Sequence, residues 1–292
     1  MKIQTQIINS LKSFKTRKYN EADEHKLLKE IDSEINNASN NRNELLANEL
    51  WHLKTLFLAQ NDYLRFLDLL LEKSYYQAWC TLEQCEIKIN SLNRHIDDFS
   101  KEKYYFHFLN FQVSRWQAIF PYKWFTSPEF RFKKVKCSIC KKAISPRGSC
   151  SHIVGELYSG KICHHIIEDM ELIGVAITQN PVMKSNVIDP KGENQNFSGL
   201  KTILDILPTP FHYWEINYTK ESIPKSYMKI ASSELCPCGS NLSYLLCCQG
   251  RASILIPHLQ ILPIKEKIEN KLDDTINIQL TILNYLRVLQ YS

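Results

Sequence analysis

The sequence predicts an α+β protein, with a mainly α-helical N-terminal region, then small zinc-stapled modules that contain β-structure, then a C-terminal helix. Two observations predict this order. Apolar residues recur at steps of three and four along about the first 120 residues, as they do on the buried faces of helices. Beyond them, apolar runs are short and bounded by proline, and eight of the ten cysteines gather there.

The length of 292 residues fits two domains with a small third module. Changes in composition place the expected boundaries near residues 120 and 200. We therefore expect a helical domain over residues 1–120, a zinc-binding β module over 121–200, and a zinc knuckle with flanking and C-terminal helices over 201–292.

The helical domain contains three periodic runs, residues 43–73, 75–95 and 101–120. None has an internal proline or glycine, and the third stops before Pro121. Helices joined by short connections pack as antiparallel neighbours, so we expect a stack of antiparallel helices. We expect Cys80 and Cys85 to occupy buried apolar positions in this stack. We expect the aromatic residues within 104–111 to belong to its hydrophobic core.

Most of the second half of the chain lacks the helical periodicity of the first half. Residues 120–136, FPYKWFTSPEFRFKKVK, contain two prolines and are expected to form a connector. From residue 137 to about residue 190 the pattern is turn-rich and typical of β-structure, as in ELIGVAITQNPVMKSNVI. The last part of the chain, from about Ile264 to Leu289, predicts a helix.

The net charge of +5 is unevenly distributed. Residues 21–100 carry fifteen acidic and eight basic side chains, a local balance of −7. A basic run follows at 131–147, with seven basic side chains and no acidic one: Arg131, Lys133, Lys134, Lys136, Lys141, Lys142 and Arg147. Such a run is typical of a solvated face, or of a contact with phosphate or with an acidic partner.

The N-terminal residues MKIQTQIINSLKSFKTRKYN lack the apolar stretch and cleavage site of a signal peptide. No apolar run approaches the roughly 18 residues of a membrane span. Thiols without a secretion signal point to a reducing compartment, where grouped cysteines are more often metal ligands than disulfides. We therefore expect a cytoplasmic protein without a membrane segment.

The first candidate metal site lies in CSICKKAISPRGSCSH, residues 137–152, and its ligands would be Cys137, Cys140, Cys150 and His152. The Cys-x2-Cys pair lets two thiolates bind one ion while nearby amides stabilise their charge. A turn at Pro146–Gly148 would bring the second pair of ligands, Cys150 and His152, close to the first pair. Three sulfurs and one imidazole predict a closed tetrahedral zinc site and disfavour magnesium or calcium.

Cys163, His164 and His165 leave two alternatives open. Cys163 could be the fourth cysteine of an iron–sulfur cluster, or could pair with a histidine in a hydrolase or nuclease. Neighbours on a strand point to opposite faces, so adjacency is weak evidence for a catalytic pair. The plainer interpretation is that these are sheet or loop residues near the zinc.

Residues 137–182 resemble a small cysteine/histidine module of phage-like and bacterial proteins. After the Cys-x2-Cys pair, the pattern is Cys-x-His-x2-Gly-x2-Tyr-x-Gly-x2-Cys, and it is matched by Cys150, His152, Gly155, Tyr158, Gly160 and Cys163. This resemblance implies a metal-stapled β unit and defines no reaction.

The second candidate site is CPCGSNLSYLLCC, residues 236–248, which presents the thiols of Cys236, Cys238, Cys247 and Cys248. Four thiolates again predict tetrahedral zinc, so we expect about two zinc ions per chain. A disulfide between the adjacent Cys247 and Cys248 would be strained.

This second stretch is similar to the SEC-C motif, the zinc-binding tail of the bacterial preprotein translocase ATPase, through Cys236, Pro237, Cys238, Gly239, Ser240, Tyr244, Cys247 and Cys248. The resemblance implies zinc held by the four cysteines, and in the translocase this tail docks on an acidic chaperone surface. Here Asn241 replaces the third glycine, and the uncharged step NLSYLL replaces the usual lysines. This chain therefore lacks the lysine side chains that would bind an acidic partner surface electrostatically. Leu242, Leu245 and Leu246 predict packing on the chain itself or on an apolar partner.

No nucleotide-binding loop, serine-hydrolase elbow or metalloprotease helix motif is present. Both predicted zinc sites are filled by protein ligands, which argues against catalytic zinc. The sequence therefore predicts a non-catalytic intracellular zinc-binding adaptor with a protein partner. The alternative is nucleic-acid binding by the basic run, which the modest net charge weakens. A hydrolase or nuclease centred on Cys163 is a third hypothesis.

Overall fold

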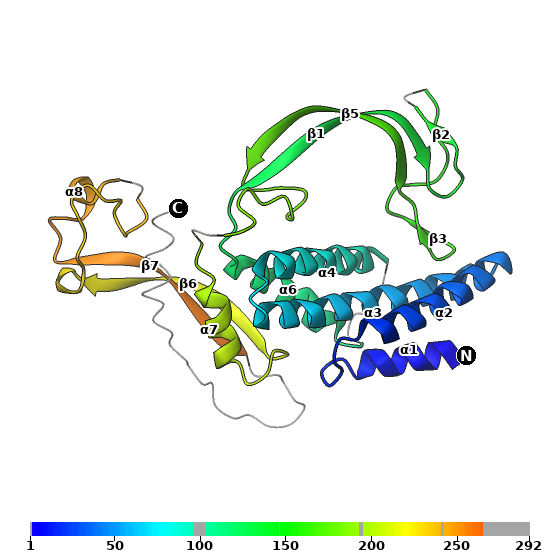
Figure 1. Cartoon of the computed structure of the whole chain (residues 1–292), viewed down its shortest axis with the longest axis horizontal. Coiled ribbons are helices and arrows are strands. Elements are labelled where there is room, and N and C mark those ends of the chain that lie inside the picture. Colours follow the sequence, from blue (N-terminus) through cyan, green and yellow to red (C-terminus); the bar gives the residue numbers. More distant parts are fainter. Residues whose placement is uncertain (1, 96–102, 146, 193–194, 241, 265–292) are drawn as a thin grey trace. The chain divides into compact units, whose positions relative to one another are not determined.

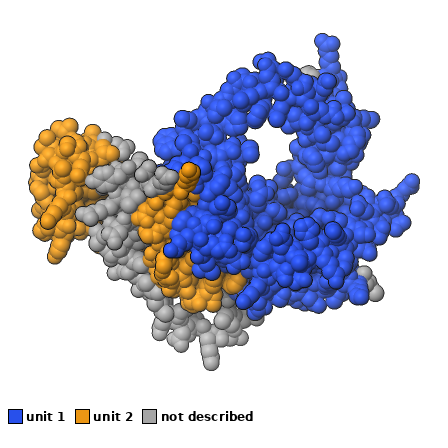
Figure 2. All heavy atoms as spheres, in the orientation of Figure 1, with its two compact units in different colours: residues 1–114, 123–190 blue, residues 115–122, 191–292 orange. Residues whose placement is uncertain are grey.

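The computed structural model describes residues 2–95, 103–145, 147–192, 195–240 and 242–264. It divides the chain into two compact units, shown in Figure 2: unit 1 comprises residues 1–114 and 123–190, and unit 2 comprises 115–122 and 191–292. Helices followed by small antiparallel sheets confirm the α+β class. Unit 1 groups the helices with the first cysteine cluster, whereas composition suggested a separate module from residue 121. From residue 265 on, the helix predicted for about Ile264 to Leu289 falls outside the described residues, and Ile264 itself ends the last described strand.

Unit 1 begins with helices whose stack can be followed in Figure 1: α1 Lys2–Lys12, α2 Glu21–Asn40, α3 Glu44–Leu71, α4 Tyr75–His95 and α6 Phe106–Ile119, the last of which continues into unit 2. Asn20 and Asn43 begin α2 and α3, because their side-chain oxygens accept hydrogen bonds from first-turn N–H groups. Left-handed residues Arg42 and Lys73 reverse the chain after α2 and α3. Short turns thus make α2, α3 and α4 antiparallel neighbours. Of these, α3 and α4 are the first two predicted runs, and α6 lies within the third.

The core of the helical stack is aromatic. Phe14, Tyr63 and Phe108 are fully buried, and their ring centroids lie 5.5 to 6.3 Å apart in tilted or edge-on contacts. Cys85 is also buried, and its thiol contacts the Ala59 carbonyl oxygen at 3.2 Å. The predicted core role of the aromatic run is thereby confirmed at Phe108. In the described part of the chain, no helix is long and apolar enough to cross a membrane.

The rest of unit 1 is built on a long antiparallel ribbon. Strand β1, Phe125–Cys137, pairs with β5, His165–Thr178, and the short β2, Ala143–Ile144, adds to the Cys137 end of β1. A small hairpin, β3 Leu157–Tyr158 and β4 Lys161–Ile162, lies between them in the chain. Figure 1 shows that β1 and β5 curve together as one ribbon.

The prediction of a connector over residues 120–136 was wrong, since β1 occupies most of it. The alternation of aromatic and basic residues from Phe130 to Lys133 has the period of a strand, and two prolines outweighed it in the sequence interpretation. Pro128 is tolerated because β1 has β5 as its partner on one side only at that point.

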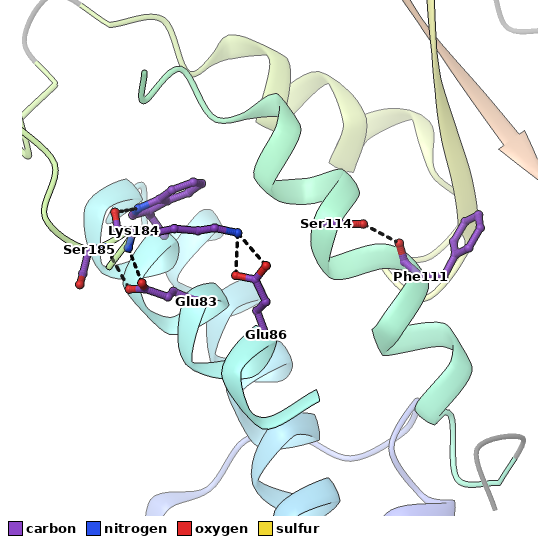
Figure 3. A network of polar contacts seen from close by, with 7 residues as sticks. Glu83, Glu86, Phe111, Ser114, Lys184 and Ser185 are labelled. Carbon is purple, nitrogen blue, oxygen red and sulfur yellow. Dashed lines mark hydrogen bonds and ion pairs between the residues drawn. The ribbon is translucent and has the colours of Figure 1, made fainter. Parts of the chain in front are cut away.

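One end of the ribbon is held on α4 by the segment that follows β5 (Figure 3). The carboxylate of Glu83, buried in the structure, accepts hydrogen bonds from the main-chain N–H groups of Lys184 and Ser185. The Lys184 ammonium pairs with Glu86 at 2.6 Å, and the Trp79 indole N–H donates to the Lys184 carbonyl at 2.6 Å. These polar contacts together fix this end.

The β3–β4 hairpin fixes the other end against α2 and α3. The N–H of Gly160 donates to the Asn48 side-chain oxygen at 2.7 Å, and that of Ser159 donates to Glu44 at 3.1 Å. Gly160 has a φ of +77°, and a Cβ there would lie 2.5 Å from an Ile35 methyl group and 2.9 Å from the Ala47 carbonyl oxygen. In the space-filling view of Figure 2, an opening passes through unit 1.

Unit 2 is organised by a second ribbon, in which β6 Tyr213–Pro224 pairs with β7 Ser253–Ile264 without a register shift. Helix α7, Ser198–Ile206, precedes it, and the short α8, Tyr244–Cys247, lies in the connection between its strands. The fully buried Trp116 and Trp214 meet edge-on at a centroid distance of 5.2 Å.

The second cysteine cluster lies between strands β6 and β7, with the short 3-10 helix η1, Lys225–Tyr227, directly after β6, where the sequence predicted flanking helices. Pro257 and Pro263 disfavour a helix in the segment that became β7, because each would remove a helical hydrogen bond. The isoleucines at 254 and 256 alternate with the period of a strand, and both are buried.

Candidate metal centres

Two groups of four side chains each bring their metal-binding atoms within 4.8 Å of one another: Cys137, Cys140, Cys150 and His152 in unit 1, and Cys236, Cys238, Cys247 and Cys248 in unit 2. These are the eight residues that the spacing predicted. Thiolate and imidazole donors suit zinc, whereas magnesium and calcium prefer oxygen donors. The chain therefore has two clusters suitable for two metal ions.

The first centre begins where β1 ends. Cys137 closes the strand, and a turn through Ser138, Ile139 and Cys140 follows, with Lys141 in the left-handed region at a φ of +62°. The N–H of Ile139 points at the Cys137 sulfur, 3.4 Å away. Main-chain N–H groups of Cys140 and Ile139 lower the pKa of Cys137 to about 6, since they stabilise the thiolate. The turn thus prepares one sulfur to bind a cation.

His152 is placed by Tyr158 of β3. The two rings meet edge-on at 4.8 Å, and the Tyr158 hydroxyl accepts the N–H of Ile153 at 3.0 Å. The Nδ1 atom of His152 is buried and has no hydrogen-bond partner among the described residues. Buried polar atoms rarely lack a partner, and a metal ion bound by the imidazole would explain why this nitrogen has none. The imidazole therefore fits a ligand of the first centre.

Cys163 lies beside this tetrad. It follows β4, is 1% exposed, and its sulfur is 3.8 Å from the sulfur of Cys137. His164 and His165 are exposed, and the Nδ1 atom of His164 lies 3.3 Å from the Ile162 carbonyl oxygen. The sequence left the role of these three residues open, and of the three the structure places the buried thiol next to the cluster.

The basic run finds much of its opposite charge within the same chain. Arg131 and Lys133 both pair with Glu171 of β5, at 3.9 and 3.1 Å, and Lys136 pairs with Glu168 at 2.6 Å. Lys134 stands opposite Asp169 in the strand register, and Lys141, Lys142 and Arg147 are exposed beyond the ribbon. The segment is therefore less positive in the folded chain than its sequence suggests.

The second centre is formed by two turns. Gly239 has a φ of +79°, and its N–H donates to the Cys236 carbonyl at 3.2 Å, which closes the Cys-Pro-Cys-Gly turn. The sulfur of Cys247 at the end of α8 lies 3.5 Å from that of Cys238 and 3.6 Å from that of Cys248. Four sulfurs thus converge on one position, as the spacing predicted.

Ionisation in the second centre is favoured at one thiol. Burial alone would raise the pKa of Cys238, but hydrogen bonds from Ser240 and the neighbouring thiols Cys236 and Cys247 bring that pKa down to about 6. Burial raises the pKa of Cys236 to about 12. Each centre therefore contains one sulfur that is readily available as a thiolate.

The knuckle packs on its own ribbon through residues other than the expected leucines. Its buried cluster consists of Ile223, Cys236, Tyr244, Cys248, Ile254 and Ile256. In contrast, Leu242, Leu245 and Leu246 are 51%, 60% and 75% exposed. Tyr244 packs on the chain itself, so of the two alternatives predicted for these leucines, only an apolar partner stays a prediction. Asn241 lies outside the described residues.

No family model, curated protein or solved structure matches this chain. The resemblances to the SEC-C motif and to the phage-like module therefore rest on the residues quoted for them alone. The fold and the sites together define an α+β protein with two cysteine-rich clusters, each suited to one metal ion.

Proposed function

We propose that this chain is a non-catalytic zinc-binding interaction protein, in which two structural zinc ions hold the cysteine-rich segments and the β1–β5 ribbon binds a partner protein. The zinc assignment is supported by one donor set of three sulfurs and one imidazole and another of four sulfurs. Four protein ligands per ion are typical of structural zinc. Such small segments bury little apolar surface, so metal binding contributes directly to their folding.

One observation carries the interaction role: one face of the ribbon is apolar and exposed. Residues directly opposite each other in antiparallel strands share a face, so Phe130 lies with Leu172 and Phe132 with Met170. These four side chains are between 38% and 56% exposed. Together they form what we call the apolar stripe.

The apolar stripe continues along the ribbon. Ile173 is an extra residue on β5, and beyond it Val175 stands opposite Pro128 and Ile177 opposite Thr126, on the same side of β1 as Phe130. Val175 and Ile177 are 59% and 68% exposed. Contiguous apolar surface of this kind marks interaction sites on folded proteins.

The charged face on the other side of the ribbon indicates which class of partner could bind the apolar stripe. There, Arg131 and Lys133 share one ion-pair partner, the carboxylate of Glu171. A polyanion would have to compete with these ion pairs, whereas a protein surface with apolar side chains could cover the stripe without disturbing them. We therefore assign a protein partner to the stripe. Nucleic-acid binding remains a prediction for the exposed Lys141, Lys142 and Arg147.

A photo-crosslinking amino acid tests this assignment. Leu172 and Glu171 are neighbours in β5 whose side chains point to opposite faces, so the probe is placed at one position or the other as a matched pair. We expect a crosslink to a partner protein in cells from position 172 and a much weaker one from position 171. The identified partner should then bind the purified chain, and Met170→Ser with Leu172→Ser should weaken that binding at least tenfold, whereas Glu171→Gln should not.

Equal crosslinking from both positions, or unchanged affinity in the double variant, would contradict the proposal. Crosslinks from position 172 only to another copy of the chain would mean self-association in place of a separate partner. Retention on heparin at low salt that is lost in Lys141→Gln with Lys142→Gln would favour the nucleic-acid alternative instead.

A further inference from the structure

The first metal centre has five nearby donors, whereas a tetrahedral ion accepts four. Besides Cys137, Cys140, Cys150 and His152, the thiol of Cys163 lies 3.8 Å from the sulfur of Cys137. Two sulfurs bound to one tetrahedral zinc at about 2.3 Å are separated by about 3.8 Å. The spacing between Cys137 and Cys163 therefore matches the edge of a zinc–sulfur tetrahedron.

Hydrogen bonds fix Cys163 to both parts of the centre. Its carbonyl oxygen accepts the N–H of Gly155 at 2.8 Å, and its N–H donates to the Glu156 carbonyl at 2.8 Å, three and four residues beyond His152. Next to it, His164 exchanges two hydrogen bonds with Ser138 of the Cys137 turn, each 2.9 Å long. The buried thiol is thus held between the turn that carries Cys137 and the loop that carries His152.

We propose that Cys163 is a fifth donor of the first metal centre and that it replaces His152 as a ligand when the imidazole is removed or dissociates. This proposal rests on the metal binding in the proposed function. In the exchange, the Cys163 thiol gives its proton to solvent and forms a metal–sulfur bond, while the metal–nitrogen bond to His152 breaks. The ion keeps four ligands and no electron is transferred.

The alternative role for this thiol is that of a hydrogen-bond donor to the Cys137 thiolate, without contact to the metal. The two roles differ in what happens when His152 is absent. A thiol that only donates a hydrogen bond leaves the vacant position to water, so the three remaining sulfurs would hold the ion no more tightly with Cys163 than without it. A fifth donor fills it, so the ion would stay.

The test uses the full chain as purified, with zinc counted by elemental analysis and the ligand sulfur followed by cobalt substitution. Four chains are compared: the wild type, His152→Ala, Cys163→Ser, and the double variant. The centre at Cys236 to Cys248 serves as an internal reference, because it should hold one ion in all four. Cys80→Ser is the control for loss of a thiol elsewhere.

We expect two ions in the wild type and in each single variant, and one ion in the double variant. In the cobalt-loaded chain, His152→Ala should show stronger thiolate-to-cobalt absorption than the wild type, because a sulfur has replaced a nitrogen. Loss of the first ion in Cys163→Ser alone would overturn the proposal, because the four resident ligands should hold the ion without this thiol.

Loss of the ion in His152→Ala with Cys163 intact would overturn the proposal, and so would retention of two ions in the double variant. Absence of metal from both centres of the wild type would contradict the proposed function itself, so the two failures are distinguishable. His152→Gln, which keeps more of the side-chain volume against Tyr158, repeats the test if the alanine variant does not fold.

Discussion

The buried carboxylate of Glu83 accepts a hydrogen bond from the main-chain N–H of Ser185 at 2.9 Å, across 102 positions of sequence. Its other oxygen accepts the N–H of Lys184. A carboxylate that receives two main-chain donors forms strong, charge-assisted hydrogen bonds. This contact therefore connects α4 to the segment after β5 and fixes one end of the ribbon that carries the apolar stripe.

Glu83→Ala should destabilise unit 1 by about 3 kcal/mol, because it leaves two N–H groups without their acceptor in a largely buried place. Urea unfolding would measure the loss, and hydrogen exchange should become faster at Lys184 and Ser185. Glu86→Ala is the matched control three residues along α4. Its ion pair with Lys184 is partly exposed, so the cost should be at most about 1 kcal/mol. Equal losses from the two variants would refute the role assigned to Glu83.

Gly160→Ala should loosen the β3–β4 hairpin from α2 and α3. The new Cβ would need a strained backbone at a φ of +77° and would meet Ile35 and the Ala47 carbonyl. We expect a loss of at least about 2 kcal/mol of unfolding free energy. At Gly174 of β5, a Cβ would meet nothing within 4 Å, so Gly174→Ala is the control and should be nearly neutral. A neutral Gly160→Ala would show that the hairpin is not packed on the helices as described.

Asp62 should give unit 1 a pH dependence. Burial raises its pKa to about 6 from an ordinary value of 3.8, although Lys88 lies 2.7 Å away. Because the folded chain then binds this proton more tightly than the unfolded chain, the contribution to stability is full below about pH 4 and is lost as the pH rises through about 6. The change amounts to at most about 3 kcal/mol, since one pKa unit corresponds to about 1.4 kcal/mol.

Asp62→Asn removes this titration. The free energy of unfolding of the variant, minus that of the wild type, should therefore increase between pH 4 and pH 7 in urea titrations. Metal release in acid affects both chains equally and cancels in this difference. Asp32→Asn, which removes the more exposed ion pair with Lys54, is the control for loss of a carboxylate elsewhere in unit 1. A flat difference for Asp62→Asn would contradict the buried carboxyl.

Cys238→Ser should lower the metal content from two ions to one per chain. The remaining ion belongs to the first centre, and the second ribbon should lose stability, because its buried cluster includes Cys236 and Cys248. Elemental analysis measures the count and separates zinc from iron, and hydrogen exchange in β6 and β7 reports the loosening. Cys80→Ser should keep both ions. An unchanged count in Cys238→Ser would refute the second site.

The sequence predicted best those features that depend on residues close together in the chain, namely the metal ligands and the helices. The turn from Cys137 to Cys140 and the turn from Cys236 to Gly239 are closed by main-chain bonds between near neighbours, so residue type and spacing were sufficient to find their ligands. The helices were found for the same reason, since their hydrogen bonds join residues four apart. Strand β1 was missed because the two prolines of residues 120–136 outweighed the local alternation of aromatic and basic residues, and its pairing with β5, some forty residues further on, is not visible in a short window.

By itself, the sequence determined that the chain has a helical first part and two groups of thiols fit to bind metal ions, because helical periodicity and ligand spacing are local properties. Only the tertiary structure decided that Cys163 lies beside Cys137, that Glu171 pairs with Arg131, and that Phe130 and Leu172 share an exposed face. The last two relationships depend on the register between β1 and β5, which one inserted residue would change. Register is set by pairing over long distances, and a single sequence read in short windows does not contain it.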